Sequence, residues 1–183
     1  MAIPVQSQIY NPISGVFGTG QVQFFGPQSG SFIWTVPQGI GKVRARCWGG
    51  GATSYAGGFA MKAIYDLTGV TIVPITVSSI AGGTSSFGSY VSATGAVAST
   101  SAGYGVGGDI NTSGNGTQVG NLFGAGYSLF GAAGATGYAS EFPGQFSIDF
   151  IGCGSTANGY TATFPGGGGG TSGAAYGLVI VEW

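Results

Sequence analysis

The side chains that could carry chemistry are few in this sequence, and their spacing fits no familiar catalytic arrangement. None of the 183 residues is a histidine, which removes the commonest general base and metal ligand and excludes Ser–His and Cys–His nucleophiles. Residues 166–170 are a glycine run followed by Thr171 and Ser172, but a phosphate-binding loop needs a lysine before the Thr or Ser and a helix after it. We therefore expect no nucleotide site, no metal site and no cofactor.

The acidic residues do not form a clear catalytic pattern either. Glu141 and Asp149 are the only acidic pair close in sequence within the glycine-rich part of the chain. A glycosidase needs two carboxyl groups that face one another across a cleft, so this pair leaves a small glycan depolymerase as a distant alternative. Carboxylates that flank loops are more often solvated or capping groups, and we expect that the protein is not an enzyme.

A basic stripe precedes the first glycine run. Lys42, Arg44 and Arg46 alternate with apolar residues, so one face of the predicted strand is basic and the other apolar. The basic face is either a contact for phosphates or sugar acids of lipopolysaccharide or a solvated strand surface paired with Asp66. We favour the solvated surface.

The two cysteines show no metal-binding or redox spacing. Cys47 and Cys153 lie far apart and form no C-x-x-C pair. In a reducing compartment two buried thiols that act as small hydrophobic groups are expected rather than a disulfide.

Composition narrows the class of partner. Charged residues make up 5% of the chain and hydrophobic residues 43%, against about 25% charged in an average soluble protein, so the chain should fold or fold on assembling. A net charge of −1 gives no field that would attract nucleic acid. The N-terminus lacks the features of a secretory signal, and the longest apolar stretch, residues 70–77, is too short for membrane insertion. We expect a protein made in a cytoplasm.

Strand signals dominate from residue 30 onward. Aromatic, β-branched and alternating runs predict strands at residues 32–36, 42–48, 59–66 and 70–77, a shorter one marked by Phe87, Tyr90 and Val91, and a closing one at 178–183. Pro74 suggests an edge strand or a bulge, whereas the nearly continuous apolar closing run is typical of a central strand. The pattern predicts an all-β fold, an antiparallel β-sandwich that is jelly-roll-like. The predicted core comprises Phe32, Trp34, Val43, Phe59, Ile72, Ile75, Val179 and Val181.

Residues 1–29 differ from the rest of the chain. They are uncharged and mix Gln, Gly and Pro with isolated large apolar residues. We expect an N-terminal attachment arm that orders against a partner, followed by one glycine-rich β-sandwich domain at residues 30–183. The candidate attachment residues are Ile9, Tyr10, Ile13, Phe17, Phe24 and Phe25.

A glycine-rich loop region spans about residues 95–176 and is closed by the strand at 177–183. It has no strict G-x-y repeat, which excludes a collagen helix. Fixing each glycine costs roughly 0.5–1 kcal/mol more than fixing alanine, so something must offset the cost. The candidates are polyproline-II-like glycine strands that hydrogen-bond laterally and burial of the interspersed aromatic residues; a disordered linker is the less favoured alternative.

Three motifs together resemble a known family. Residues 36–39 read V-P-Q-G, residues 48–51 read W-G-G-G, and residues 177–183 read G-L-V-I-V-E-W. Over about residues 30–183 the chain resembles the glycine-rich distal domains of tailed-phage tail-fibre and receptor-binding proteins.

The resemblance implies an adhesin at the tip of a tail fibre or tail. Its place would be the virion, its ligand a bacterial outer-membrane protein or surface glycan, and its N-terminal arm would dock onto another tail or virion protein. It implies a homo-oligomer, a trimer by preference, with a monomeric cap on a trimeric fibre as the alternative. A purely structural virion protein, such as a head decoration or fibre-joining subunit, is the second candidate function.

The glycine-rich loops are the expected recognition surface. Tyr, Ser, Asn and Gly supply aromatic contact area and adaptable hydrogen bonding, as they do in antibody paratopes. The candidate receptor-binding residues are Tyr104, Asn111, Asn115, Phe123, Tyr127, Tyr138 and Tyr160, of which we expect about half to face outward. Asn111 and Asn115 also match the N-glycosylation acceptor pattern, but without a secretory signal we favour turn residues over glycosylated ones.

Overall fold

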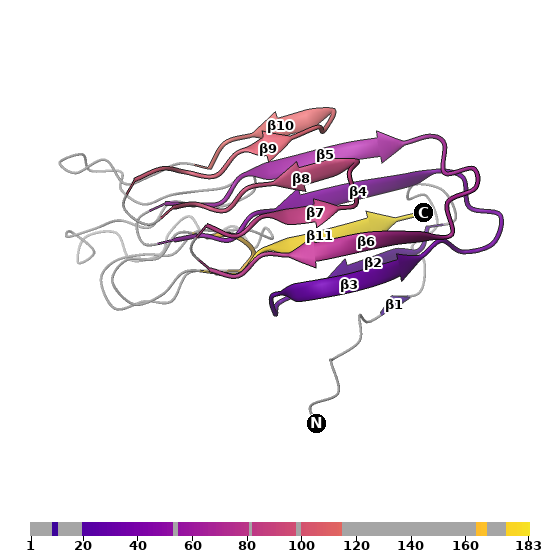
Figure 1. Ribbon diagram of the computed structural model, residues 1–183, viewed down its shortest axis with the longest axis horizontal. Coiled ribbons are helices and arrows are strands. Elements are labelled where there is room, and N and C mark those ends of the chain that lie inside the picture. The colour runs from indigo at the N-terminus through magenta and orange to yellow at the C-terminus, as the bar shows by residue number, and fades with distance from the viewer. Residues whose placement is uncertain are drawn as a thin grey trace, which may run out of the picture.

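The structure is a computed structural model that describes residues 9–10, 20–52, 55–80, 82–97, 100–114, 164–167 and 175–183. Within these residues the chain forms two antiparallel sheets and no helix (Figure 1). The strands are β1 (Ile9–Tyr10), β2 (Val22–Phe25), β3 (Gly30–Thr35), β4 (Val43–Trp48), β5 (Phe59–Ile64), β6 (Ile72–Val77), β7 (Ser85–Phe87), β8 (Val91–Ala93), β9 (Gly105–Val106), β10 (Ile110–Thr112) and β11 (Leu178–Glu182). The predicted all-β antiparallel sandwich is confirmed.

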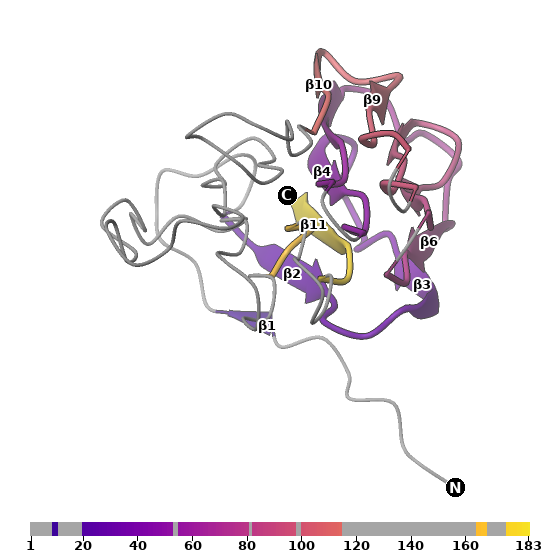
Figure 2. The ribbon, with the colours of Figure 1, turned by 90° about the vertical axis from the view of Figure 1, so that its left-hand side faces the viewer.

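The two sheets lie face to face. Sheet A has six strands in the order β1-β2-β11-β4-β5-β10, and sheet B has five in the order β3-β6-β7-β8-β9. Figure 2 looks onto one end of the sandwich and shows β2, β11 and β4 in one layer and β3 and β6 in the other. The β9–β10 hairpin joins the two sheets on one side, because β9 pairs with β8 and β10 pairs with β5.

Alternation in the sequence decides which side chains enter the core. In β4 the side chains of Val43, Ala45 and Cys47 are fully buried between the sheets, and those of Arg44 and Arg46 lie on the opposite face. Trp34 is at the centre of the core, with ring centroids 5.6 Å from Phe87 and 5.5 Å from Trp183. The two-residue period of β-strands therefore accounts for the core.

Most of the predicted core residues are buried. The buried ones are Trp34, Val43, Phe59, Ile75, Val179 and Val181. Phe32 is half-buried and packs against the core beside Phe25, with ring centroids 5.7 Å apart. Phe59 belongs to a second cluster with Trp48, Leu178 and Ile180. These four residues lie on the face of sheet A that points away from sheet B, because each is next in sequence to a residue whose side chain points into the core.

The prediction for Ile72 is wrong. Its side chain is 54% exposed, whereas Val73, Ile75 and Val77 are buried. Residues 72 and 75 are three positions apart and therefore lie on opposite faces of any regular strand. The expectation that Pro74 marks an edge is also wrong, since β6 lies between β3 and β7. Pro74 lies where the β6–β7 pairing ends, and its carbonyl accepts the Gly88 N–H at 2.7 Å. The N–H that proline lacks therefore removes little from the hydrogen bonding between β6 and β7.

The expected boundary between an arm and the sandwich at residue 29 does not hold for β2. β11 lies between β2 and β4, and all five of its residues are buried, which confirms the predicted central strand. β2 pairs with β11 along its length, and β1 pairs with β2. Residues 22–25 are therefore part of the sandwich.

The candidate attachment residues meet different outcomes. Phe25 is a core residue at 4% exposure, and Phe24 packs half-buried against the second cluster, so neither serves a free arm. The backbone of Ile9 and Tyr10 pairs with β2. Ile13 and Phe17 lie outside the described residues.

Candidate functional site

One end of the sandwich is built from closely packed glycine segments. At this end, on the left in Figure 1, β4, β6, β8 and β10 finish and β5, β7 and β11 begin. We call the region the glycine platform; it comprises residues 49–52, 55–58, 94–97, 101–104, 113–114, 166–167 and 175–177. None of these residues carries a charge.

Main-chain hydrogen bonds link the segments of the glycine platform side by side. They are Gly49 N to Gly58 O at 3.0 Å, Gly58 N to Thr94 O at 3.0 Å, Gly57 N to Gly166 O at 3.0 Å, Gly51 N to Ala175 O at 2.8 Å, Ala96 N to Gly50 O at 2.8 Å, Gly103 N to Ala56 O at 3.0 Å and Gly114 N to Gly103 O at 2.8 Å. Segments distant in sequence are thus held by backbone contacts, as extended strands are in a sheet.

The spacing of the segments requires glycine. A Cβ added at Gly49 would overlap the carbonyl group of Thr94, and one at Gly57 would overlap the carbonyl group of Gly49. In both cases the obstacle is backbone, which cannot rotate away. In the glycine platform, lateral hydrogen bonds between bare glycine segments therefore contribute to offsetting the cost of ordering these glycines.

A buried pair of serines lies next to the glycine platform. The hydroxyl of Ser85 donates to the Ser78 hydroxyl at 3.0 Å and accepts the Ser78 N–H at 3.0 Å. The Gly177 N–H donates to the Ser78 carbonyl at 3.1 Å. These bonds join the start of β11 to the chain between β6 and β7.

Of the seven candidate receptor-binding residues, Tyr104 is placed on the glycine platform. Its side chain is 56% exposed. Its backbone is fixed to Thr94: the Thr94 N–H donates to the Tyr104 carbonyl at 2.9 Å, and the Tyr104 N–H donates to the Thr94 hydroxyl at 2.8 Å. Tyr104 therefore combines a rigid main chain with an accessible ring.

Asn111 has a structural role instead. Its side-chain oxygen accepts the Gly108 N–H at 2.9 Å, and its side-chain nitrogen donates to the Gly108 carbonyl at 2.7 Å. The amide thus stabilises the turn between β9 and β10, in agreement with its interpretation as a turn residue, and its role in receptor binding stays a prediction.

The other candidates lie outside the described residues, and the structure places the chain on either side of them. Those candidates are Asn115, Phe123, Tyr127, Tyr138 and Tyr160. Gly114 is bonded to Gly103, and Gly166 is bonded to both Gly57 and Tyr176. The two ends of the intervening segment are therefore anchored in the glycine platform.

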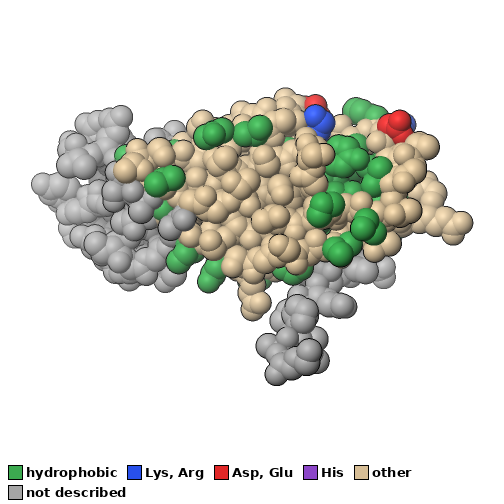
Figure 3. Space-filling model, viewed as in Figure 1, with side chains coloured by type: hydrophobic (Ala, Val, Ile, Leu, Met, Phe, Trp, Pro, Cys, Tyr) green, Lys and Arg blue, Asp and Glu red, His purple; other side chains and the backbone are tan. Residues whose placement is uncertain are grey.

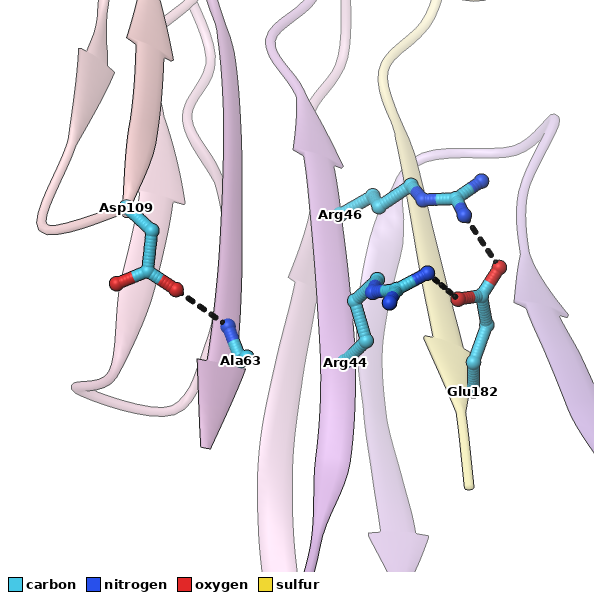
Figure 4. A network of polar contacts seen from close by, with 5 residues as sticks. All are labelled: Arg44, Arg46, Ala63, Asp109 and Glu182. Atoms are coloured by element: carbon cyan, nitrogen blue, oxygen red, sulfur yellow. Dashed lines mark hydrogen bonds and ion pairs between the residues drawn. The ribbon is translucent and has the colours of Figure 1, made fainter. Parts of the chain in front are cut away.

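Charged side chains in the described chain lie away from the glycine platform, mostly along sheet A. Glu182 is 4% exposed and accepts from two arginines: Arg46 lies at 2.6 Å and Arg44 at 3.3 Å (Figure 4). The antiparallel register places Arg44 directly opposite Glu182. The partner of the basic stripe is therefore Glu182 and not Asp66, which was the expectation.

Two further charges fix local structure. Asp109 accepts the Ala63 N–H at 2.8 Å (Figure 4), and Lys62 donates to the Gly107 carbonyl at 2.7 Å; both contacts hold the β9–β10 turn against β5. Asp66 sits in an exposed turn, where hydrogen bonds from the hydroxyl and the N–H of Thr68 hold the pKa of its carboxyl below the usual range.

The described chain contains no group of three or more His, Cys, Asp or Glu that could hold a metal ion. An open depression of about 360 Å³ lies between the turns at residues 36–41 and 67–71, far from the glycine platform, and its polar lining is threonine, glutamine and backbone.

Cys47 is a buried free thiol, as predicted, and Cys153 lies outside the described residues. Burial, which outweighs a backbone hydrogen bond at Phe87, raises the pKa of the Cys47 thiol far above its ordinary value. Because the thiolate is the reactive form, Cys47 in a Cys153→Ser variant should react with a disulfide reagent at least about a thousandfold more slowly in the folded than in the denatured protein. Absorbance of the released thiolate measures both rates; fast labelling of the folded protein would contradict this burial.

Comparisons with known proteins complete the description. The chain matches no protein-family model and no curated protein. The described residues contain no helix long and apolar enough to cross a membrane. A function must therefore be argued from the residues and their arrangement.

Sequence patterns missed part of this site. The glycines at 49–51, 57 and 58 precede the tract at 95–176, and the first three are part of the W-G-G-G motif. Each lies directly after or before a predicted strand, and that position is a usable signal: glycine pairs at adjacent strand ends indicate that the strand connections approach one another closely.

Proposed function

We propose that this chain is a receptor-binding protein, an adhesin of a phage tail fibre or tail tip that recognises an outer-membrane protein or a surface glycan of a bacterium. The observation that carries the proposal is the glycine platform. It is uncharged, it is fixed by main-chain hydrogen bonds, and both ends of the aromatic, asparagine-containing segment at residues 115–163 are anchored in it.

This arrangement suits recognition of a neutral ligand. Binding residues are commonly carried by connections on a rigid sheet scaffold, since their side chains vary without disturbing the core. Except for the half-buried Gly114, the glycines of the glycine platform are themselves buried, so its accessible surface is supplied by side chains such as those of Tyr104 and Tyr176. A surface that binds ionic ligands through side chains would need charges, and the residues of the glycine platform carry none.

Tyr104→Ala tests the position of the site. We expect the variant to bind host cells roughly thirtyfold more weakly, because truncation of an aromatic anchor costs about 2 kcal/mol, with little change in thermal stability. Flow cytometry with the fluorescently labelled chain and competition with phage adsorption measure the effect.

Tyr65→Ala is the matched control for that experiment. Tyr65 is 67% exposed and follows β5 at the opposite end of the sandwich. We expect wild-type binding from this variant. Equal binding by the two variants would place recognition away from this part of the glycine platform, and absence of any binding by the wild-type chain to cells that the phage infects would contradict the adhesin proposal itself.

A purely structural virion protein is the second candidate. It is favoured by the uncharged outer face of sheet B, part of which is exposed isoleucine. Immunogold labelling of virions separates the two functions. Label at the tail tip supports an adhesin, whereas label on the head, with no binding to cells, supports a decoration protein.

A further inference from the structure

β3 is an open edge of sheet B. It pairs on one side with β6, and on the other side no strand of the described residues lies beside it. The Val36 N–H donates to the Thr71 carbonyl at 2.9 Å. Because the direction of the backbone groups alternates along a strand, the even-numbered residues of β3 also turn their N–H and C=O groups toward β6. The backbone groups of Ser31, Ile33 and Thr35 therefore point outward, and within the described chain they make no hydrogen bond.

This edge lacks the features that usually protect an edge strand. Natural edges carry lysines, prolines or bulges that prevent pairing with another chain, and β3 reads Gly-Ser-Phe-Ile-Trp-Thr. Ile33 is 66% exposed, and its neighbour on the same face, Ile72, is 54% exposed. No residue in any strand of sheet B is charged. The face of the molecule in Figure 3 accordingly shows mainly tan and green atoms, with charges only toward its margin.

The other edge strands of the described sheets, β1, β9 and β10, are only two or three residues long. In sheet A, β2 is covered by β1. On the opposite side of the sandwich the β9–β10 hairpin bridges the sheets, and Lys62, Asp109 and Asn111 hold its turn. Of the sheet edges in the described chain, β3 is the long one that is open.

A second copy of this chain fits the open edge. Identical edges carry identical charges and repel one another unless they are neutral, and β3 is neutral. If two β3 strands run antiparallel with Ile33 opposite Ile33, Ser31 lies opposite Thr35 on both sides, and each outward N–H meets an outward carbonyl. The facing pairs are then isoleucine with isoleucine and serine with threonine, both of which stabilise antiparallel sheets.

We propose that two copies of the chain associate through β3 around a twofold axis between their Ile33 residues, so that the two copies of sheet B become one continuous sheet. Such an interface is self-complementary and closes as a dimer, in contrast to the trimer that the sequence resemblance implies. The axis is perpendicular to the strands, so the two glycine platforms lie at opposite ends of the dimer. The proposal does not depend on receptor binding.

The mass of the full chain in solution is the first test. Light scattering after gel filtration should give twice the 18.0 kDa of the chain. Ile33→Pro removes an outward N–H and the isoleucine side chain at the axis but leaves the pairing with β6 intact, so we expect a folded protein by circular dichroism whose dimer dissociation constant is raised roughly tenfold to a hundredfold. A monomeric or trimeric wild-type chain, or a dimer unaffected by Ile33→Pro, would overturn the proposal.

A matched pair of charged variants checks that the edge, and not the whole face, is responsible. Ile33→Lys places two like charges directly opposite each other at the axis and should give a monomer. Ile72→Lys adds the same charge to an isoleucine of similar exposure one strand inward, and the dimer should persist. Equal behaviour of the two variants contradicts pairing through β3.

Disulfide trapping tests the register. In an antiparallel hydrogen-bonded pair the Cα atoms are about 5.5 Å apart, within the range of a disulfide. In a Cys153→Ser background, Ile33→Cys should therefore form a covalent dimer on oxidation. Thr35→Cys lies opposite Ser31 of the other copy and should not. Cross-linking of both variants to the same extent, or of neither, would exclude this register.

Discussion

Gly49→Ala should destabilise the sandwich by more than about 3 kcal/mol. The added Cβ would overlap the Thr94 carbonyl, and this carbonyl cannot move freely because it accepts the Gly58 N–H while the Thr94 N–H is bonded to Tyr104. Overpacking in a well-packed region costs about 1–3 kcal/mol when side chains can adjust, and here only backbone can. In a chain of this length the loss lowers the melting temperature by about 6–12 °C.

Gly41→Ala is the matched control for this prediction. A Cβ at Gly41 would meet no atom within 4 Å, and the residue does not have the positive φ of its neighbour Gly39. Alanine there restricts the unfolded chain and should leave stability unchanged or raise it by about 0.4–1 kcal/mol. Denaturant titration followed by circular dichroism measures both variants. If Gly49→Ala proves as stable as Gly41→Ala, the segments of the glycine platform do not approach one another as closely as described.

Glu182→Ala should produce the second large effect, a loss of about 2–3 kcal/mol. Its carboxylate is almost fully buried and is shared by Arg44 and Arg46, whose side chains are 32% and 30% exposed. Removing one partner of a buried ion pair typically costs about 3–5 kcal/mol, and partial access of water to the two guanidinium groups reduces that figure. The variant removes the carboxylate that these two adjacent positive charges share.

Two further variants show whether the ion pairs cause the loss. Asp66→Asn removes a fully exposed carboxylate and should cost less than about 1 kcal/mol. Arg46→Met combined with Glu182→Met should be less destabilised than the two single variants predict together, because the double change removes both members of the ion pair and adds apolar contact beside Ile180. Additive effects would show that Arg46 and Glu182 do not interact in solution.

The stability that Glu182 provides also bears on the proposed receptor binding and on the proposed dimer. Glu182 and its arginines fix β11 between β2 and β4, and β11 begins at the glycine platform, next to Gly177. A weakened β11 should therefore loosen the glycine platform before it affects β3, which belongs to the other sheet. Receptor binding and dimerisation should consequently respond differently to Glu182→Ala.

The sequence by itself determined the local structure. Alternating Val43, Ala45 and Cys47 predicted a strand with one buried face, and the continuous apolar run at 178–182 predicted a central strand; both features follow from a two-residue period that depends only on neighbours in the chain. Ile72 was misplaced because hydrophobicity was weighed without that period.

Tertiary structure decided everything that depends on pairing between distant segments. The choice of Glu182 over Asp66 as the partner of Arg44 follows from the register of β11 against β4, and the place of β2 in the sandwich follows from its pairing with β11. Within the candidate site, composition selected Tyr104 and Asn111 equally, but only the folded chain separates an exposed ring from an amide engaged in a turn. Likewise, glycine content predicted close backbone contact, whereas the particular glycines that touch are fixed by which strand ends the sheets bring together.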